Sequence, residues 1–123
     1  MSDYEIIGPA AAGPSMEVVV GAGSRFFAGH FPGRPVLPAV AQLMLVEALL
    51  RRACGGGARI VAVDRLRLLQ PSGPGDRLTV RLEPGGSGAA GVGATAGSAR
   101  FRIERGATHV SEGVLHWSSG GGG

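Results

Sequence analysis

A histidine in a proline-rich segment is the residue of this chain best suited to do chemistry. His30 is closely followed by three prolines, at positions 32, 35 and 38, and then by an apolar stretch. Each proline fixes its own φ angle, so the backbone beside the histidine should be stiff. An imidazole titrates near neutral pH, which suits His30 to act as a general base or acid. The segment therefore predicts a rigid loop that presents a reactive histidine.

The start of the helix expected after this loop offers a second group for chemistry. The first backbone N–H groups of a helix lack intrahelical acceptors, and the helix dipole adds partial positive charge there. Such donors can hold a carbonyl oxygen that is becoming an enolate oxyanion. Glu47 lies farther along the same apolar stretch and is the candidate acid. These parts suit removal of a proton next to a thioester carbonyl, followed by loss of a β-hydroxyl group.

One helix and several strands must position these groups. The expected helix spans Ala39–Arg52, after Pro38 and before the glycine run 55–57. Before its terminal arginines only Gln42 and Glu47 are polar, which predicts a helix buried on nearly all sides by a sheet. We expect Gln42 to satisfy a loop carbonyl.

Alternating apolar and polar residues predict strands on both sides of this helix. They are expected at residues 4–7, 16–20, 59–70, 77–83, 98–105 and 108–117. Within 59–70, we expect Ile60, Ala62, Leu66 and Leu68 to share one face. Helix and strands are segregated along the chain, so the fold class is α+β. We expect one domain at residues 1–117 and a disordered Ser/Gly tail at residues 118–123.

Composition and charge argue against several classes of function. The 123 residues fit one domain, and 44% hydrophobic residues argue against a disordered chain. No apolar run is long enough to cross a bilayer and no signal peptide is recognisable, so we expect a cytoplasmic protein without membrane contact. Dispersed arginines and 5% aromatic residues do not favour nucleic-acid binding. Cys54, the one cysteine, is expected to be a buried structural thiol, and no metal site is expected.

The segment that contains the histidine resembles a known family motif. Residues 30–38 read HFPGRPVLP, which is similar to the H-F-P-x-x-P-[VIL]-[ML]-P-G motif of the 3-hydroxyacyl-[acyl-carrier-protein] dehydratases. The continuation AVAQL, residues 39–43, is most similar to the P-G-V-A-Q-L variant of dehydratases associated with aryl polyene pathways. Residues 63–76 resemble the family's strand and turn with F-x-x-P and P-G-D.

The resemblance implies both a fold and an activity. The fold is the hotdog fold, in which a curved antiparallel β-sheet wraps one long buried helix. The activity is that of a lyase, which converts a 3-hydroxyacyl thioester to a trans-2-enoyl thioester in fatty-acid or polyketide biosynthesis.

The resemblance also implies roles for single residues. His30 matches the family's catalytic histidine, which removes the α-proton and helps to expel water. Ala39 matches the glycine whose backbone N–H binds the thioester carbonyl. Gly33, Val40 and Met44 are expected to line the substrate site.

Partners follow from the same resemblance. The family uses no cofactor, and its histidine and acid come from different subunits of a dimer. We therefore expect no cofactor, a homodimer or a larger oligomer, and an acyl carrier protein or a CoA thioester as the source of substrate. Arg25 and Arg34 lie on either side of His30 in the sequence and are weaker candidates for docking an acidic carrier.

One position departs from the family pattern. The family's acid follows the histidine by fourteen residues, and here that position is Met44. In a gap-free alignment the acid is lost, and Met44 packs in the core or lines a substrate tunnel. With a three-residue insertion, VEAL at residues 46–49 matches the family's acid segment and Glu47 takes the role. The unbroken match before Met44 favours the gap-free alignment, yet residues three apart on a helix are neighbours, so Glu47 stays the candidate acid.

Three functions are therefore open. The first is a dehydratase with His30 as base and Glu47 as acid. The second is a catalytically impaired homologue that binds acyl thioesters or acts as a partner subunit, which Met44 would explain. The third, an acyl thioesterase, is disfavoured because the His30 loop belongs to dehydration.

Overall fold

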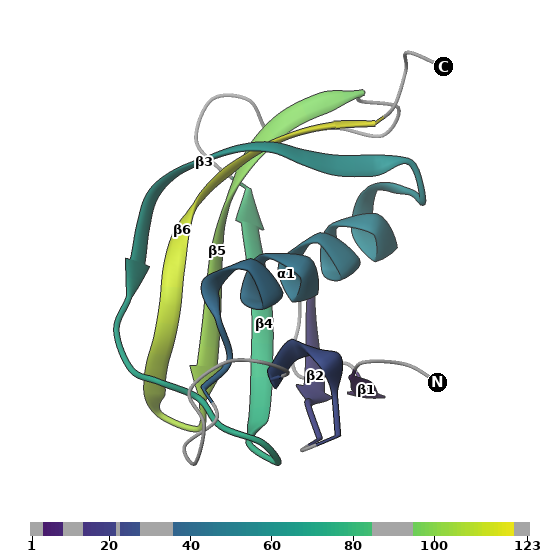
Figure 1. Ribbon diagram of the computed structural model, residues 1–123. Coiled ribbons are helices and arrows are strands. Elements are labelled where there is room, and N and C mark those ends of the chain that lie inside the picture. Colours follow the sequence, from purple (N-terminus) through teal and green to yellow (C-terminus); the bar gives the residue numbers. More distant parts are fainter. Residues whose placement is uncertain (1–3, 9–13, 22, 28–35, 85–94, 120–123) are drawn as a thin grey trace.

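One antiparallel sheet curves around a long helix in the computed structural model, which describes residues 4–8, 14–21, 23–27, 36–84 and 95–119 (Figure 1). The strands are β1 (Glu5–Gly8), β2 (Ser15–Val19), β3 (Ala58–Leu68), β4 (Arg77–Pro84), β5 (Ala96–Arg105) and β6 (Thr108–Ser119). They are hydrogen-bonded in the order β1-β2-β4-β5-β6-β3. The helix is α1 (Ala39–Cys54), and a 3-10 turn, η1 (Arg25–Phe27), precedes it. The predicted α+β class and hotdog arrangement are confirmed.

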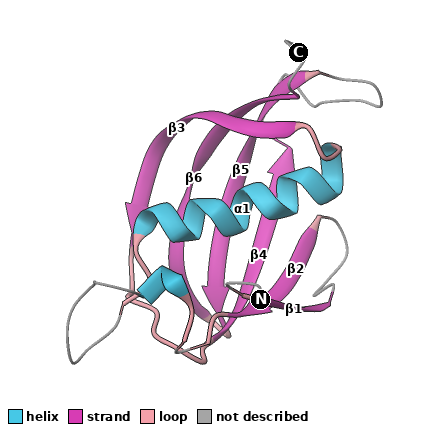
Figure 2. Ribbon diagram, turned by 45° about the vertical axis from the view of Figure 1, so that its right-hand side comes forward, coloured by secondary structure: helices cyan, strands magenta, loops and turns pink. Residues whose placement is uncertain are grey.

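The core lies between α1 and the concave face of the sheet. Figure 2 shows α1 crossing this face while β3 arches over it, and α1 contacts both β3 and β4. On β5, Ala99 and Phe101 are buried, whereas Arg100 between them is exposed. This alternation is what a sheet with one buried face requires. On the opposing side of the core, Leu45 and Val46 of α1 are fully buried.

Strand β3 departs from the regular alternation that the sequence predicted. Its register against β6 shifts between Ile60 and Ala62, and again between Asp64 and Arg67. Each shift changes which residues face the core, because side chains alternate strictly along a regular strand. Leu68 is 58% exposed. The prediction that the apolar residues of this strand share one face is therefore wrong.

Helix α1 is not buried on all sides. Val40 is 64% and Met44 51% exposed, so neither belongs to the core of this chain. The prediction of an enclosed helix, and of Met44 as a core residue, is wrong because the curved sheet covers α1 from one side. The alternative, that Met44 lines a substrate tunnel, stays a prediction. No helix in the described ranges is long and apolar enough to span a membrane.

The last strand extends beyond its predicted end. Strand β6 continues to Ser119, because Ser118 pairs with Arg59 and Ser119 with Ala58. The boundary expected after residue 117 therefore falls inside β6, and residues 120–123 lie outside the described part of the chain.

Candidate functional site

The predicted histidine loop falls on residues that the structure does not describe. His30, Gly33 and Arg34 lie within the range 28–35, so their predicted roles remain predictions. The described residues on either side of this range are Phe27, at the end of η1, and Val36, shortly before α1. These two ends and the helix define the candidate site.

The entrance to the loop is built on buried aromatic residues. Phe26 and Phe27 of η1 are both buried, and the N–H of Phe26 donates to the Ser24 hydroxyl oxygen over 3.1 Å. The ring of Tyr4 stacks on Phe26 with a centroid distance of 6.1 Å. These contacts hold Arg25, a predicted docking residue, at the entrance to the histidine loop.

The other end of the loop leads into a helix without a side-chain cap. Pro38 occupies the N-cap position with extended backbone angles, φ −73° and ψ 162°, and makes no side-chain capping bond. Its carbonyl accepts the first helical bond, from the N–H of Gln42 over 3.1 Å. The N–H groups of Ala39, Val40 and Ala41 precede that bond and have no intrahelical acceptor. This geometry retains the donors, and the partial positive charge, on which the predicted role of Ala39 depends.

Leu37, one residue before the cap, is held from two sides. Its N–H donates to the Ser72 carbonyl over 2.8 Å, and its own carbonyl accepts from Gln42 Nε2 over 3.1 Å. Gln42 is only 5% exposed, so this bond satisfies the buried Nε2 donor of its amide, whereas Oε1 has no hydrogen-bond partner among the described residues. The predicted role of Gln42, satisfying a loop carbonyl, is confirmed.

The turn between β3 and β4 contains Ser72 and therefore holds Leu37 in place; we call this turn and its contact with Leu37 the brace. Asp76 Oδ2 accepts hydrogen bonds from the Gly73 N–H over 2.9 Å and from the Ser72 hydroxyl over 3.2 Å. From β5, Arg105 Nη1 donates to the Pro71 carbonyl over 2.7 Å and lies 3.4 Å from Asp76 Oδ2. The turn is thus ordered by one carboxylate and one guanidinium, and it positions the residue that leads into α1.

Sequence reasoning did not assign a role to the residues of this brace. The P-G-D resemblance pointed to the turn but not to its contact with Leu37, which lies far away along the chain. Nothing in the sequence indicated a role for Arg105, because its position opposite the turn depends on the pairing of β5 with its neighbours.

Glu47, the candidate acid, is joined to β3. Its Oε2 accepts a hydrogen bond from the Ile60 N–H over 2.9 Å, and its Oε1 lies 3.3 Å from Arg51 Nη2. Arg51 Nε in turn donates to the Ala58 carbonyl over 3.1 Å. Both carboxylate oxygens are therefore engaged in a network that ties α1 to the first residues of β3.

The residues predicted on the helix form one stripe. Val40, Met44 and Glu47 are spaced by four and three residues, so they lie on the same face of α1. Val40 and Met44 are more than half exposed, while the Glu47 side chain is 27% exposed. The structure thus brings together two predicted substrate-lining residues and the candidate acid on a surface that this chain alone does not cover.

Cys54, at the end of α1, is partly buried. Burial raises the pKa of its thiol, so less of the reactive thiolate is present at neutral pH. Cys54 is less buried than predicted, and its raised pKa favours the predicted structural role over that of a nucleophile. Among the residues described, no three His, Cys, Asp or Glu side chains gather closely enough to hold a metal ion.

Comparisons with known sequences point to one family. A family model described as ApeI-like, ApeI dehydratase, matches residues 11–113. The 3-hydroxyacyl-[acyl-carrier-protein] dehydratase FabZ of Paramagnetospirillum magneticum is 38% identical over 66 residues, which are 46% of this chain and 41% of that protein. The FabZ of Alkalilimnicola ehrlichii is 40% identical over 72 residues, 47% of this chain and 43% of that protein. The matches thus span less than half the length of these curated relatives.

Solved structures share the fold over almost the whole chain. The Dehydratase Heterocomplex ApeI:P from Xenorhabdus doucetiae superposes with a TM-score of 0.73 at 19% identity, covering 96% of this chain and 99% of that one. The fluoroacetyl-CoA thioesterase FlK gives a TM-score of 0.64 at 20% identity, covering 96% and 87%. At such identities the likeness shows the hotdog fold alone. The family model, in contrast, covers most of the sequence, and this chain therefore belongs to the ApeI-like dehydratase family.

Proposed function

We propose that this protein is a 3-hydroxyacyl-thioester dehydratase that acts on an acyl chain carried by an acyl carrier protein or by CoA. A base removes a proton from the carbon next to the thioester carbonyl, and the C3–OH bond breaks. The hydroxyl group leaves as water after taking up a proton, and the product is a trans-2-enoyl thioester. No oxidant, reductant or cofactor enters this balance.

The start of α1 is the observation that carries the proposal. It has no side-chain cap, and the hydrogen bonds of Leu37 hold its approach in place. Free N–H donors fixed in this way stabilise an enolate oxyanion without reorganising during the reaction. The histidine motif leads directly into these donors, as the chemistry requires.

We assign the base to His30 and the acid to Glu47. Glu47 is the acidic residue of α1 and lies on the same stripe as Met44, about one turn farther along. Its bonds with Ile60 and Arg51 fix where the carboxylate points. As the acid, Glu47 would give its proton to the leaving hydroxyl group.

A second copy of the chain would complete the site. The stripe of Val40 and Met44 is apolar and exposed, and β3 forms one end of the sheet with Val61 64% exposed. Long exposed edge strands with apolar side chains favour pairing with another chain. A homodimer that pairs along β3 would cover this stripe and bury the substrate between the subunits.

An acyl carrier protein is the favoured source of the substrate. The curated relatives are named for acyl carrier protein substrates, and Arg25 and Arg34 lie on either side of His30 in the sequence, where an acidic carrier would deliver its acyl chain. The reaction is a biosynthetic step, and we infer a cytoplasmic location from it.

A partner subunit without full activity is the second candidate function. It is favoured by Met44 at the family's acid position and by the engagement of both Glu47 oxygens. A solved structure with this fold is described as a dehydratase heterocomplex, which supports a role as partner subunit. In that case the acid would come from another chain.

A dehydration assay separates the two functions. The purified protein is incubated with a 3-hydroxyacyl group on carrier protein or on a pantetheine mimic, and enoyl formation is followed. We expect turnover that is lost in His30→Ala and falls about 10²-fold or more in Glu47→Gln. The matched control is Glu17→Gln, which removes a carboxylate of β2, outside the site.

The other outcomes are equally informative. Turnover that is insensitive to Glu47→Gln removes that residue from the mechanism. A wild-type protein that turns over no substrate, together with activity gained in Met44→Glu, contradicts the dehydratase proposal for this chain alone and favours the partner subunit.

A further inference from the structure

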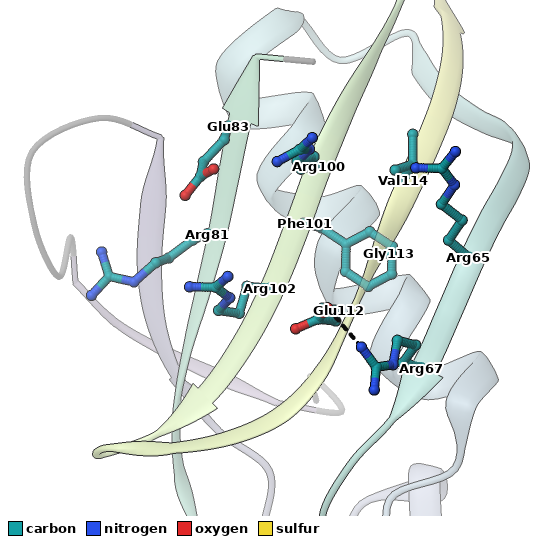
Figure 3. A pocket seen from close by; sticks show the side chains of 10 residues that line it. All are labelled: Arg65, Arg67, Arg81, Glu83, Arg100, Phe101, Arg102, Glu112, Gly113 and Val114. Carbon is teal, nitrogen blue, oxygen red and sulfur yellow. Dashed lines mark ion pairs between the residues drawn. The ribbon is translucent and has the colours of Figure 1, made fainter. Parts of the chain in front are cut away.

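The outer face of the sheet, turned away from α1, carries a hollow lined by arginines (Figure 3). Its volume is about 260 Å³, and its arginines come from three strands: Arg65 and Arg67, Arg81, and Arg100 and Arg102. Two glutamates also line it. The hollow is separated from the candidate active site by the thickness of the sheet, so a function for it does not rest on the proposed dehydratase activity.

The register of the strands gathers these arginines. Arg102 of β5 lies opposite Arg81 of β4 on one side and opposite Glu112 of β6 on the other. Glu112 in turn lies opposite Arg67 of β3. Two like charges placed directly opposite each other in a sheet are unfavourable unless an anion lies nearby. Negative charge at this surface would therefore relieve the repulsion between Arg81 and Arg102.

A β-bulge adds Arg65 to the hollow. Asp64 pairs with Val114 and Arg67 with Glu112, so β3 advances by three residues where β6 advances by two. Arg65 has a φ of 54°, a left-handed conformation that is unfavourable for a residue other than glycine. Strict alternation from Asp64 would turn positions 65 and 67 toward the helix, and the bulge brings both to the outer face.

The residues that the structure describes do not balance the charges of the hollow. Arg67 Nη1 lies 3.9 Å from Glu112 Oε2, and the guanidinium of Arg81 is paired with the carboxylate of Glu104. Across the described residues, no ion pair involves the other three arginines of the hollow. The second glutamate of the lining, Glu83, has no ion-pair partner in the same set. Three unpaired guanidinium groups against one carboxylate leave a net charge of +2.

The central arginine also lacks a hydrogen-bond acceptor. The Nε of Arg102 is shielded from solvent and has no hydrogen-bond partner among the described residues. A buried donor without an acceptor is costly, and native proteins rarely keep one without a reason. An oxyanion that enters the hollow and displaces the side chains covering Arg102 would supply that acceptor.

We propose that this hollow binds the phosphate group of a phosphate monoester. Guanidinium groups bind phosphate through paired, charge-assisted hydrogen bonds. A phosphate monoester carries a charge of about −1.5 to −2 at neutral pH, which matches the unpaired charge of the lining. A second copy bound through the same face would place arginines against arginines, so charge disfavours that occupant.

Binding of small phosphates by the intact chain tests the proposal. Inorganic phosphate and glycerol 3-phosphate are titrated calorimetrically at constant ionic strength, with chloride as the background anion. Arg100→Gln and Arg102→Gln should each weaken glycerol 3-phosphate binding about tenfold. The control Arg59→Gln removes the same charge from an exposed position of β3 that does not line the hollow. It should change the affinity less than about twofold, because surface charges outside contact range are screened.

In labelled protein, glycerol 3-phosphate should shift the NMR signal of the Arg102 Nε–H.

Four results would overturn the proposal. One is the absence of saturable binding by either phosphate. Another is an equal loss of affinity in Arg59→Gln, since that would mean general charge attraction. Binding of inorganic phosphate but not of the monoester would exclude the proposed ligand class. Finally, a hexaglutamate peptide that binds more tightly than glycerol 3-phosphate and displaces it would make the hollow a docking surface for an acidic protein.

Discussion

The carboxylate of Glu47 accepts a hydrogen bond of 2.9 Å from the backbone N–H of Ile60, and this bond ties α1 to the first residues of β3. The same carboxylate pairs with Arg51 one turn along the helix. Through these two contacts Glu47 stabilises the fold, whatever it does in catalysis. Variants must separate these two contributions.

Amide and alanine substitutions of Glu47 measure its contribution to stability. In Glu47→Gln the side-chain oxygen can still accept from Ile60, so we expect the free energy of unfolding to fall by less than about 1 kcal/mol. In Glu47→Ala the Ile60 N–H loses its acceptor, and the loss should reach about 1–3 kcal/mol. Urea denaturation measures both. Equal losses in the two variants would mean that the Ile60 bond contributes nothing to stability.

The brace at Leu37 should affect both stability and the order of the helix start. Asp76→Ala leaves the Gly73 N–H and the Ser72 hydroxyl without their acceptor, and we expect a loss of about 1–3 kcal/mol. The exchange of the Leu37 amide proton should accelerate more than that of Leu45, in the middle of α1. Unchanged exchange at Leu37 would show that the turn does not hold the loop.

The exposed stripe of α1 should control assembly. Val40→Asp places a charge where the second copy is proposed to pack, and the desolvation cost of a buried charge should yield monomers in light scattering after size-exclusion chromatography. Ile7→Asp is the control, because Ile7 is 45% exposed but lies on β1, at the opposite end of the sheet. A dimer that survives Val40→Asp and dissociates in Ile7→Asp would place the interface elsewhere.

Gly113 should be intolerant of any side chain. A Cβ at this position would lie 2.7 Å from the ring of the buried Phe101, so Gly113→Ala should cost about 1–3 kcal/mol through overpacking. Gly21→Ala meets no atom within 4 Å and should be close to neutral. The double variant Gly113→Ala, Phe101→Leu should recover part of the loss in thermal unfolding; additive losses would argue against a direct clash.

The thiol of Cys54 should react slowly at neutral pH. Burial raises its pKa above the ordinary value of 9.0, so the folded protein holds the proton at a pH where the unfolded chain has lost it. Any stability from this difference is present below pH 9 and declines as pH rises further. Alkylation by iodoacetamide should reach half its maximal rate above pH 9 in the native protein; a midpoint below 9 would contradict the burial argument.

The sequence by itself determined the fold class, and it predicted where the chemistry lies. Alternation in β4 and β5 and the apolar run of α1 are local patterns, and the spacing of a histidine and prolines is visible without coordinates. The bond from Gln42 to Leu37 could also be foreseen, because both partners are close in the chain. Local periodicity carries such information because each residue's environment follows from its immediate neighbours.

Only the tertiary structure decided which residues of different elements contact one another. The bulges of β3 cannot be read from alternation, since an extra residue matters only relative to a partner strand. The exposure of Met44 depends on how far the curved sheet reaches around α1. Likewise, Glu47 meets Ile60, and arginines of β3, β4 and β5 meet across the outer face, because strand pairing joins positions far apart in the sequence.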